Sequence, residues 1–464
     1  MNLSRRELLA GATALTLRAA WADDAVSSQM AMDAVLKRIH APEFPDRKFD
    51  ITTYGAISGG SADCTAPIRK AVEACSAAGG GIVLVPRGTF LTGPIHLKSN
   101  VNLHLDEGAT LRFSTIPAQY PTVYSRWEGT ECMNFSPLIY AFEQTNIAIT
   151  GPGTLDGQAG TQHWWPWKGN DRSGWKAGQP QQKADRDALV AMGNKNVPVS
   201  QRVFGLGHYL RPPFVQPYRC TNVLIEGVSI KGSPFWELNP VLSRNVTVRN
   251  VTIDSHGPNN DGCDPESCDG VLIEGCSFST GDDCIAIKSG RNEDGRRVGV
   301  PCQNLVVRNC VMKDGHGGVS IGSEVSGDVR NVIVDHCRMD SPQLERALRI
   351  KSNTYRGGVV ENVYFANNTV GQVAEAVLDI DFNYEEGNGG PHNPVVRNVV
   401  VENVTSGRSK RAIYLRGFPN APIIGVRVSN CTFSNAAEPN VVENVRGLKL
   451  ESVKRNGKVL SGAG

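Results

Sequence analysis

The fold of this chain is decided by a repeated stretch, which reads NVLIEGVSI at Asn222–Ile230 and NVTVRNVTI at Asn245–Ile253. In both copies an Asn opens the unit and apolar residues then alternate with other residues, as in a strand with one buried face. The pattern starts again at Gly270, Asn304, Asn331, Asn362, Asn398 and Gly425. Such a repeat predicts one structural unit used many times, whose apolar face is buried only when the units stack.

The repeat length favours a single all-β domain that forms a right-handed parallel β-helix. Successive units begin about 23 to 36 residues apart, and no long helical pattern separates them. A β-propeller is the alternative, but each of its blades needs four antiparallel strands in roughly 40 residues. We therefore expect the β-helix to span residues 46–455, followed by a C-terminal tail at residues 456–464.

A short amphipathic helix near the N-terminus should cover the first coil. Asp63 is a candidate N-cap for this helix. The apolar residues that follow at helical spacing are Ile68, Ala71, Val72 and Cys75. A stack of strands needs such a cap over its open end.

Residues 1–22 have the features of an export signal. Arg5-Arg6 precedes an apolar run, and Ala20-Trp21-Ala22 forms an A-x-A cleavage site. The paired arginines favour the twin-arginine route, with an ordinary secretory signal as the alternative. We therefore expect a periplasmic or secreted protein, in which the polar residues 23–45 form a linker.

Composition and spacing limit the partners of the protein. Its formal net charge is +2 over 464 residues, which argues against a surface that coats nucleic acid. No stretch reaches the ~20 apolar residues of a membrane span. The cysteine spacings match no zinc pattern. We expect no metal, no cofactor and a monomer.

Four cysteines fall at one position of the repeat, which other units fill with valines such as Val228 and Val251. They are Cys276, Cys310, Cys337 and Cys431. Because a free Cys behaves as a small buried hydrophobe, we expect them to stack inside the coils. The spacing leaves open a disulfide among Cys263, Cys268, Cys284 and Cys302.

A further strand in each repeat carries charged residues on its outward face. Inward positions are apolar, as in Ile285 and Ile287, and successive residues of a strand point to opposite faces. The basic residues of the outward row are Lys288, Arg349, Lys351 and Arg416. This row gives a nearly neutral protein a local attraction for a polyanion.

Three carboxylates and a histidine come just before these strands. The repeat register places Asp261 and Asp283 at matching positions of adjacent coils, separated by roughly one strand spacing of 4.8 Å. The same register places His316 beside Asp282. Carboxylates this close cannot all ionise freely, so at least one pKa should rise and one group can act as acid while another acts as base.

Turn formation is the alternative explanation for these residues, since Asx residues favour turns. For a single motif the turn would be the better interpretation. Three acidic groups in register with His316, Arg349 and Lys351 favour a catalytic site instead.

From about Asp50 to Arg446 the sequence resembles the polygalacturonases of glycoside hydrolase family 28. The motifs that carry the resemblance are Asn259-Asn260-Asp261-Gly262, Gly281-Asp282-Asp283, Gly315-His316-Gly317 and Arg349-Ile350-Lys351, in the order of the family. The chain departs slightly at Asn260, where the family usually has Thr. The resemblance implies a pectin-lyase-like solenoid that hydrolyses α-1,4 bonds between the galacturonate units of pectin with inversion.

The resemblance also implies roles for the site residues. Asp282 would be the general acid, Asp261 and Asp283 would hold and deprotonate the attacking water, and His316 would support the acid. Arg349 and Lys351 would bind a galacturonate carboxylate beside the scissile bond. Further substrate-binding candidates are Asn259, Tyr384, Lys288 and Arg416, of which Tyr384 matches a substrate-contacting tyrosine of the family.

The predicted spacing of the carboxylates does not suit the simplest inverting geometry. Inverting glycosidases usually hold their carboxylates about 6.5–9.5 Å apart and retaining ones about 5–5.5 Å apart. Adjacent coils predict the smaller separation. We still expect inversion, because the resemblance implies it and two carboxylates can share one water.

A long insertion at residues 158–217 interrupts the repeats, and such loops are usually functional or disordered. Its tryptophans, in His163–Trp167 and at Trp175, either stack on sugar faces or pack the insertion onto the β-helix. With Glu293–Val300 and Asn383–Asn393 it would close one end of a groove. We therefore expect exo-action from the non-reducing end.

Other functions remain as alternatives. An endo-acting enzyme or a rhamnogalacturonan hydrolase shares the fold, although Arg349-Ile350-Lys351 favours a galacturonate at the cleavage point. A pectate lyase would use Ca²⁺ held by oxygen ligands, for which Asp264, Glu266, Asp379 and Asp381 are candidates. A non-catalytic pectin-binding solenoid is the third alternative.

Overall fold

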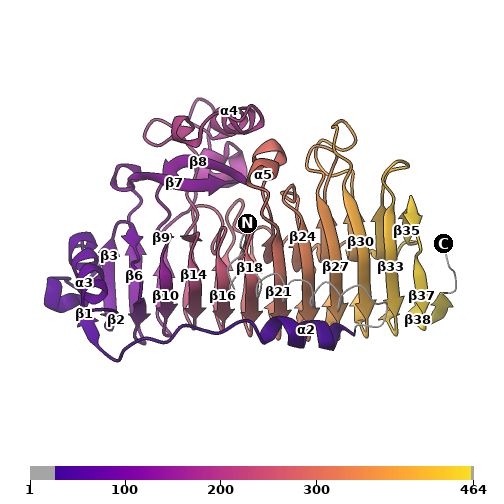
Figure 1. The fold of residues 1–464 in the computed structure, drawn as a ribbon, viewed down its shortest axis with the longest axis horizontal. Coiled ribbons are helices and arrows are strands. Elements are labelled where there is room, and N and C mark those ends of the chain that lie inside the picture. The colour runs from indigo at the N-terminus through magenta and orange to yellow at the C-terminus, as the bar shows by residue number, and fades with distance from the viewer. Residues whose placement is uncertain (1–26, 461–464) are drawn as a thin grey trace, which may run out of the picture.

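The computed structural model describes residues 27–460, so the predicted export signal at residues 1–22 lies outside the described part. The chain forms one elongated stack of coils, with the N-terminal and C-terminal coils at opposite ends (Figure 1). Long sheets run along the stack, and their neighbouring strands are parallel. This arrangement confirms the predicted right-handed parallel β-helix.

The first long sheet has 14 strands. In spatial order they are β1 (Lys48–Asp50), β2 (Gly81–Val85), β5 (Val101–Leu105), β10 (Thr145–Thr150), β14 (Thr221–Glu226), β16 (Arg244–Arg249), β18 (Asp269–Glu274), β21 (Cys302–Arg308), β24 (Val329–Asp335), β27 (Val359–Ala366), β30 (Val395–Glu402), β33 (Ile423–Ser429) and β36 (Val445–Arg446), with β37 (Lys449–Glu451) also paired to β33.

The second long sheet has 13 strands. They are β3 (Gly88–Thr92), β6 (Ala109–Phe113), β11 (Thr154–Asp156), β15 (Ser229–Lys231), β17 (Thr252–Ser255), β19 (Ser277–Thr280), β22 (Val311–Met312), β25 (Arg338–Asp340), β28 (Thr369–Gln372), β31 (Thr405–Arg408), β34 (Thr432–Phe433), β38 (Val453–Arg455) and β39 (Lys458–Leu460).

The third face of the stack consists of two shorter sheets. One contains β4 (Ile95–His96), β9 (Ile139–Phe142) and β13 (Val215–Tyr218), and the other contains β20 (Ile285–Ile287), β23 (Val319–Ile321), β26 (Arg346–Lys351), β29 (Ala376–Asp381), β32 (Arg411–Arg416) and β35 (Val441–Glu443).

The core is a set of apolar columns that the repeat register builds. In the first sheet, Val223 pairs with Val246, which pairs with Val271, and all three side chains are buried. Each coil alone would leave this face in water, so the burial of apolar area by stacking stabilises the whole solenoid.

The Asn or Gly that opens each repeat has a backbone reason. Asn331 has φ of 57° and Gly270 has φ of 77°, in the left-handed region that favours these two residue types. The Asn side chains also stack, because Asn331 Nδ2 donates to Asn304 Oδ1 at 2.9 Å and Asn362 Nδ2 donates to Asn331 Oδ1 at 2.9 Å. The repeat signal therefore combines a turn conformation with an amide ladder.

All twelve cysteines are free and buried. Cys276, Cys310, Cys337 and Cys431 lie inside the coils, as predicted. The structure also answers the open question about Cys263 and its neighbours, since they too are unpaired.

The first coil is covered by α3 (Thr65–Ala77), which follows the 3-10 helix η1 (Ile51–Tyr54). The four apolar residues predicted for this helix are all buried. Asp63 acts one residue earlier than an N-cap, where its carboxylate accepts from Thr65 N at 2.8 Å.

Both predicted flanking segments differ from expectation. The described part of the predicted linker, residues 27–45, contains the helix α2 (Ser28–Leu36), which lies along the outside of the first sheet (Figure 1) and packs Met32 and Val35 against Val306 and Ile333. The predicted tail is also partly ordered, since β39 pairs antiparallel with β38. Short apolar patterns in polar surroundings concealed both elements.

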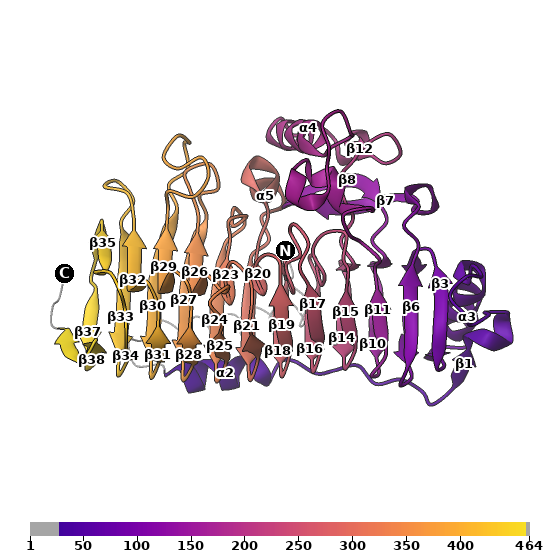
Figure 2. The same cartoon turned by 180° about the vertical axis from the view of Figure 1, so that it is seen from behind.

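Two excursions from the coils stand together over one side of the stack (Figures 1 and 2). The first is an antiparallel hairpin of β7 (Thr122–Trp127) and β8 (Thr130–Phe135), which the sequence analysis did not predict. The second is the predicted insertion, with η3 (Trp165–Lys168), η4 (Asp171–Ser173), α4 (Lys183–Asn194), η5 (Val199–Gln201) and β12 (Val203–Phe204). Strand β12 pairs with β8, so the two excursions form one unit, which α5 (Asn292–Val298) joins; η2 (Pro117–Gln119) precedes the hairpin.

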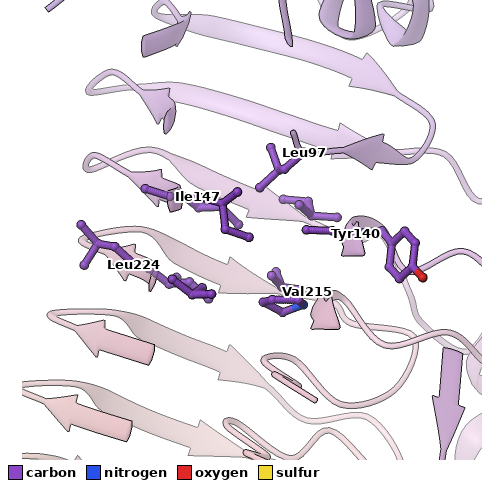
Figure 3. Close-up of a pocket in the computed structure, with 12 residues that line it drawn as sticks. Leu97, Tyr140, Ile147, Val215 and Leu224 are labelled. Atoms are coloured by element: carbon purple, nitrogen blue, oxygen red, sulfur yellow. The ribbon is translucent and has the colours of Figure 1, made fainter. Parts of the chain in front are cut away.

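A small apolar cavity lies between the neighbouring coils that contain β9, β10, β13 and β14. Leu97, Ile147 and Val215 are among the side chains that line it (Figure 3). Its volume of about 10 Å³ leaves room for no more than about one water, so it holds no sugar. Among residues 27–460, no helix is long and apolar enough to cross a membrane.

Candidate active site

The third face is interrupted where the acidic residues lie. Instead of full strands, this region has isolated bridges, in which Cys263 joins Leu238 to Ile285 and Glu266 joins Val241 to Lys288. This irregular backbone joins β13 to β20, and the acidic motifs lie at its edge.

The predicted register of the acidic residues is confirmed. Gly262 N donates to Asp283 O at 3.0 Å, which places Asp261 and Asp283 at matching positions of adjacent coils. One carboxylate oxygen from each of Asp261, Asp282 and Asp283 lies within 4.8 Å of the others. The three side chains nevertheless have different surroundings.

Asp283 is the most enclosed of the three. It is completely buried, and its two oxygens contact Lys351 Nζ at 2.7 Å and Ser320 Oγ at 2.8 Å, with Arg349 at 3.9 Å. Burial alone would raise the pKa of Asp283, but Lys351 and Arg349 outweigh it and the net shift is downward. Asp283 is therefore an anion held by two cations.

Asp282 is the most accessible carboxylate, with 18% of its side chain exposed. Its Oδ1 lies 2.9 Å from His316 Nδ1, and its Oδ2 accepts from Asn259 Nδ2 at 3.4 Å. Burial opposes ionisation of Asp282, but the hydrogen bond and charge of His316 outweigh it and lower the pKa of Asp282. The same hydrogen bond raises the pKa of His316, so the pair keeps its shared proton to a higher pH than a free imidazole would.

Asp261 is buried and has the opposite tendency. Burial, with the charges of Asp264 and Asp282, raises the pKa of Asp261 well above its ordinary value, although Lys288 Nζ lies 3.8 Å away. Its Oδ1 has no hydrogen-bond partner within residues 27–460. A carboxylate whose pKa is raised is a stronger base, and Asp261 lies close enough to Asp283 for both to contact one water.

The basic motif lies next to these carboxylates. Arg349 and Lys351 are on β26, and both stand over the ring of Tyr384, at 5.4 Å and 5.2 Å from its centroid. The structure therefore brings Tyr384 to the site, although it lies in a loop of variable length. These three side chains can hold a carboxylate beside Asp282.

A pocket of about 530 Å³ opens over the carboxylates, within the size range of small-molecule sites. Its floor includes Asn259, Asp261, Asp282, His316 and Lys351. Its walls come from both excursions and from the loops after β23 and β29; the lining residues there are Glu128, Lys168, Gln181, Gln182, Lys183, Arg186, Glu324 and Glu385.

An ion-pair network holds the walls together. Glu128 on the hairpin contacts Arg186 of α4 at 2.6 Å and Arg291, beside α5, at 3.0 Å. Arg291 also reaches Glu385 at 3.5 Å, so four segments far apart in the sequence meet at one point. The walls predicted at Glu293–Val300 and Asn383–Asn393 are thus near the pocket and joined to the insertion.

Two of the predicted substrate contacts have other partners. Arg416 does not line the pocket; it contacts Glu443 at 3.1 Å and Tyr414 Oη at 3.1 Å. Lys288 lines the pocket but is buried, stands 4.4 Å from the centre of the Trp236 ring and contacts Asp264 at 3.5 Å. Lys288 is therefore a buried counter-ion of acidic side chains, and not an exposed member of the predicted outward row of basic residues.

The tryptophans of His163–Trp167 serve packing. Trp164 is buried and meets Tyr120 and Trp167 edge to face, and Trp165 Nε1 donates to Ser233 O at 2.9 Å. For this cluster the structure supports packing onto the β-helix. Trp175 instead donates from Nε1 to Gln179 O within the insertion, so its role stays a prediction.

Several pocket residues escaped the sequence analysis. Lys168, Glu128 and Glu324 lie in the pocket, and Arg211 supports it from below by donating to Asn259 Oδ1 at 2.9 Å. They stand outside the repeat pattern, so no spacing rule pointed to them. Asn259 connects Lys168 and Arg211 to the motifs, and Lys288 connects Glu324 to Asp261.

Asp261, Asp282 and Asp283 are the group within residues 27–460 whose oxygens could reach one metal ion. Calcium and magnesium prefer such oxygens. Here Lys351, Lys288 and His316 already supply positive charge to the group, and their charges would repel a cation. The donor set therefore fits proton transfer better than metal binding.

Comparison with known proteins agrees with this geometry. The sequence profile of the family described as glycosyl hydrolases family 28 matches residues 205–453. The crystal structure of a hyperthermoactive exopolygalacturonase from Thermotoga maritima is 45% identical, with a TM-score of 0.91, over 93% of this chain and 97% of that one.

Two curated relatives are less similar but cover most of the chain. An exo-poly-alpha-D-galacturonosidase of Dickeya chrysanthemi is 27% identical over 83% of this chain and 71% of its own length. An endo-polygalacturonase of Pectobacterium parmentieri is 30% identical over 78% of this chain and 82% of its own length. With its fold, its four motifs and these matches, the chain belongs to family 28 of the glycosyl hydrolases.

Proposed function

We propose that the protein is an exo-acting polygalacturonase, which hydrolyses α-1,4 bonds and releases galacturonate from the non-reducing end of polygalacturonate. The observation that carries the proposal is the placement of Asp282, paired with His316, on the floor of a pocket walled by the insertion. The similarity to the Thermotoga maritima exopolygalacturonase, at 45% identity, supports the same activity.

Asp282 is the general acid in this proposal, since it is the carboxylate of the three that a glycosidic oxygen can reach. The proton that it shares with His316 moves onto Asp282 when substrate binds. Lys351 contributes to the low pKa of Asp282, and a uronate carboxylate bound to Arg349 and Lys351 neutralises that contribution. Substrate binding thereby raises the pKa of Asp282 in the enzyme–substrate complex, where this residue must donate its proton.

Asp283 and Asp261 act on the attacking water. The ionised Asp283 orients it, and the Asp261 carboxylate, which lines the pocket, accepts a hydrogen bond or proton from it. The separation within 4.8 Å is short for an inverting pair by the usual rule. Because two carboxylates share one water, inversion is still the proposed outcome.

Stereochemistry is tested by following the first product by proton NMR. Initial formation of the β-anomer from the α-linked substrate is expected. Initial formation of the α-anomer would refute single displacement and leave the short carboxylate distance as the sign of a covalent intermediate.

Exo-action follows from the walls around the pocket, and product analysis separates it from endo-action. With polygalacturonate, we expect reducing ends to accumulate while viscosity falls slowly, with monogalacturonate as the early product. A rapid fall in viscosity with mixed oligomers would support endo-action, as in the Pectobacterium relative. Unsaturated, ultraviolet-absorbing products that need Ca²⁺ would indicate a lyase.

The proposal also includes export of the folded monomer by the twin-arginine route. The twelve free, buried cysteines support it, because chains folding in an oxidising compartment would form wrong disulfides. Sequencing of the N-terminus of the periplasmic protein should give Asp23, and a start at Met1 would contradict export by cleavage. Light scattering of the purified protein checks the monomer.

A further inference from the structure

The insertion carries a lysine that lines the pocket and whose charge has no carboxylate partner within ion-pair distance. Lys168 lines the pocket and donates from Nζ to Asn259 Oδ1 at 2.9 Å. Within residues 27–460, no carboxylate lies within 4.0 Å of Lys168 Nζ. Its hydrogen-bond partner is a neutral amide oxygen, which leaves two ammonium donors for a ligand.

A second cation without a carboxylate partner stands behind the first. Arg211 is completely buried, and its guanidinium donates to Gln182 Oε1, to the carbonyls of Pro234 and Pro258, and to Asn259 Oδ1. All these acceptors are neutral. Burial, with the nearby charge of Arg211, lowers the pKa of Lys168. Arg211 is buried and Lys168 is partly buried, and the carboxylates that act on both of them, Glu128 and Asp282, lie beyond ion-pair distance. A ligand carboxylate that contacts Lys168 directly would supply the counter-charge that this pair lacks.

The place of Lys168 relative to Asp282 identifies the ligand. Asn259 lies between them, since its oxygen accepts from Lys168 and its Nδ2 donates to Asp282 Oδ2 at 3.4 Å. Arg349 and Lys351 lie on later coils, on the C-terminal side of Asp282. A sugar chain along the stack therefore meets one cation group on each side of the general acid.

The local structure holds Lys168 firmly. It is the last residue of η3, and Gly169 follows with φ of 84°. The side chain of Trp165 is tied to Ser233 O, and the carbonyl of Trp167 accepts from Gln182 N at 2.7 Å. These contacts fix the backbone of η3, and the hydrogen bond to Asn259 Oδ1 orients the ammonium group, as a specificity contact requires.

We propose that Lys168 binds the carboxylate of the terminal, non-reducing galacturonate and makes the enzyme selective for an acidic sugar at the end that it removes. This inference rests on the proposed exo-polygalacturonase function and adds the residue that recognises the galacturonate to be released. Arg211 positions Asn259 and strengthens the local positive charge.

The test compares two substrates that differ in one carboxylate. They are trigalacturonate and the same trimer methyl-esterified only on its non-reducing unit. For the wild type, kcat/KM should be about 10- to 100-fold higher on the acid, as expected for a charge-assisted contact. In Lys168→Met, kcat/KM should fall on the acidic trimer and stay unchanged on the esterified one, so that the preference is lost. Lys168→Arg should keep most of the preference.

The control is Lys176→Met, which removes an exposed lysine of the same insertion away from the pocket. It should keep the wild-type rates on both substrates. If Lys168 only braced Asn259 and Asp282, Lys168→Met would lower both rates equally and preserve the ratio, which would overturn the inference. A wild type that does not distinguish the two trimers would overturn it as well.

The products formed by the wild type distinguish failure of the proposed function from failure of the role of Lys168. A wild type that releases no galacturonate from trigalacturonate, but cleaves longer chains internally, would contradict exo-action. A wild type that releases galacturonate, together with an unchanged ratio in Lys168→Met, contradicts only the role of Lys168.

Discussion

His316 Nδ1 lies 2.9 Å from Asp282 Oδ1, although 34 residues separate them in the chain. The contact follows from the stacking of one coil on the next, since Ile285 pairs with Val319 and carries Asp282 to the level of His316. The other ring nitrogen, Nε2, lies 4.0 Å from Glu345. The pair stores one proton on the floor of the pocket.

The stored proton predicts the pH dependence of activity. His316→Asn should move the alkaline limb of the kcat/KM profile to lower pH, because Asp282 then holds the proton without help. In the wild type this limb should lie above pH 6.5, since the pKa of His316 is raised from that value. Profiles on trigalacturonate check this. An identical limb in both proteins would show that another group supplies the proton.

The same pair predicts a stability window. The raised pKa of His316 stabilises the fold fully below pH 6.5 and loses its effect as pH rises through the folded value. The lowered pKa of Asp282 stabilises it above pH 3.8 and loses its effect at lower pH. The Tm difference between wild type and His316→Asn should therefore peak between these values, and remain small because 48% of His316 is exposed. A difference that grew in alkali would contradict this.

Removal of the proposed acid should abolish most turnover. Asp282→Asn is expected to lower kcat by roughly 10²- to 10⁴-fold, because the amide cannot donate an acidic proton. Binding of trigalacturonate, measured by calorimetry, should persist. The matched control is Asp254→Asn, at an exposed carboxylate that contacts His256, and it should retain full activity. Equal losses in both variants would point to a folding defect.

Lys351 should matter for stability as well as binding. Lys351→Met leaves the buried Asp283 without its 2.7 Å partner and is expected to lower the free energy of unfolding by about 3 kcal/mol. Lys410→Met removes a partner of Glu375 at the surface and should cost less than about 1 kcal/mol. Denaturant titrations of both variants decide whether Asp283 depends on Lys351 as the contact indicates.

The Asn ladder predicts an order of stabilities. Asn331→Gly loses the stacked amide but fits φ of 57°, whereas Asn331→Ala loses the amide and adds backbone strain. The Ala variant should be less stable than the Gly variant by about 1 kcal/mol. Thermal unfolding should give the order wild type, Gly, Ala. An Ala variant as stable as Gly would show that the side-chain ladder alone explains the repeat signal.

The sequence by itself determined the stack and the register. Apolar residues at fixed intervals are buried when one coil stacks on the next. Parallel strand pairing then aligns each position of one repeat with the same position of its neighbour. The stacking of Asp261 on Asp283, the pairing of His316 with Asp282 and the burial of Cys276 all follow from that single regularity. The segments without a period, α2 and the hairpin β7–β8, were missed for the same reason.

Only the tertiary structure decided what encloses the site and how its charges are divided. The contact of Lys168 with Asn259 joins residues 91 apart, and that of Glu128 with Arg291 joins residues 163 apart. No local pattern encodes such contacts, because they depend on where two excursions from different coils fold back. Asp261 and Asp283 also differ in pKa. Burial raises the pKa of Asp261, whereas the charge of Lys351 outweighs burial and lowers the pKa of Asp283. Three identical side chains acquire different chemistry because their solvent and counter-ions, which repeat spacing does not specify, differ.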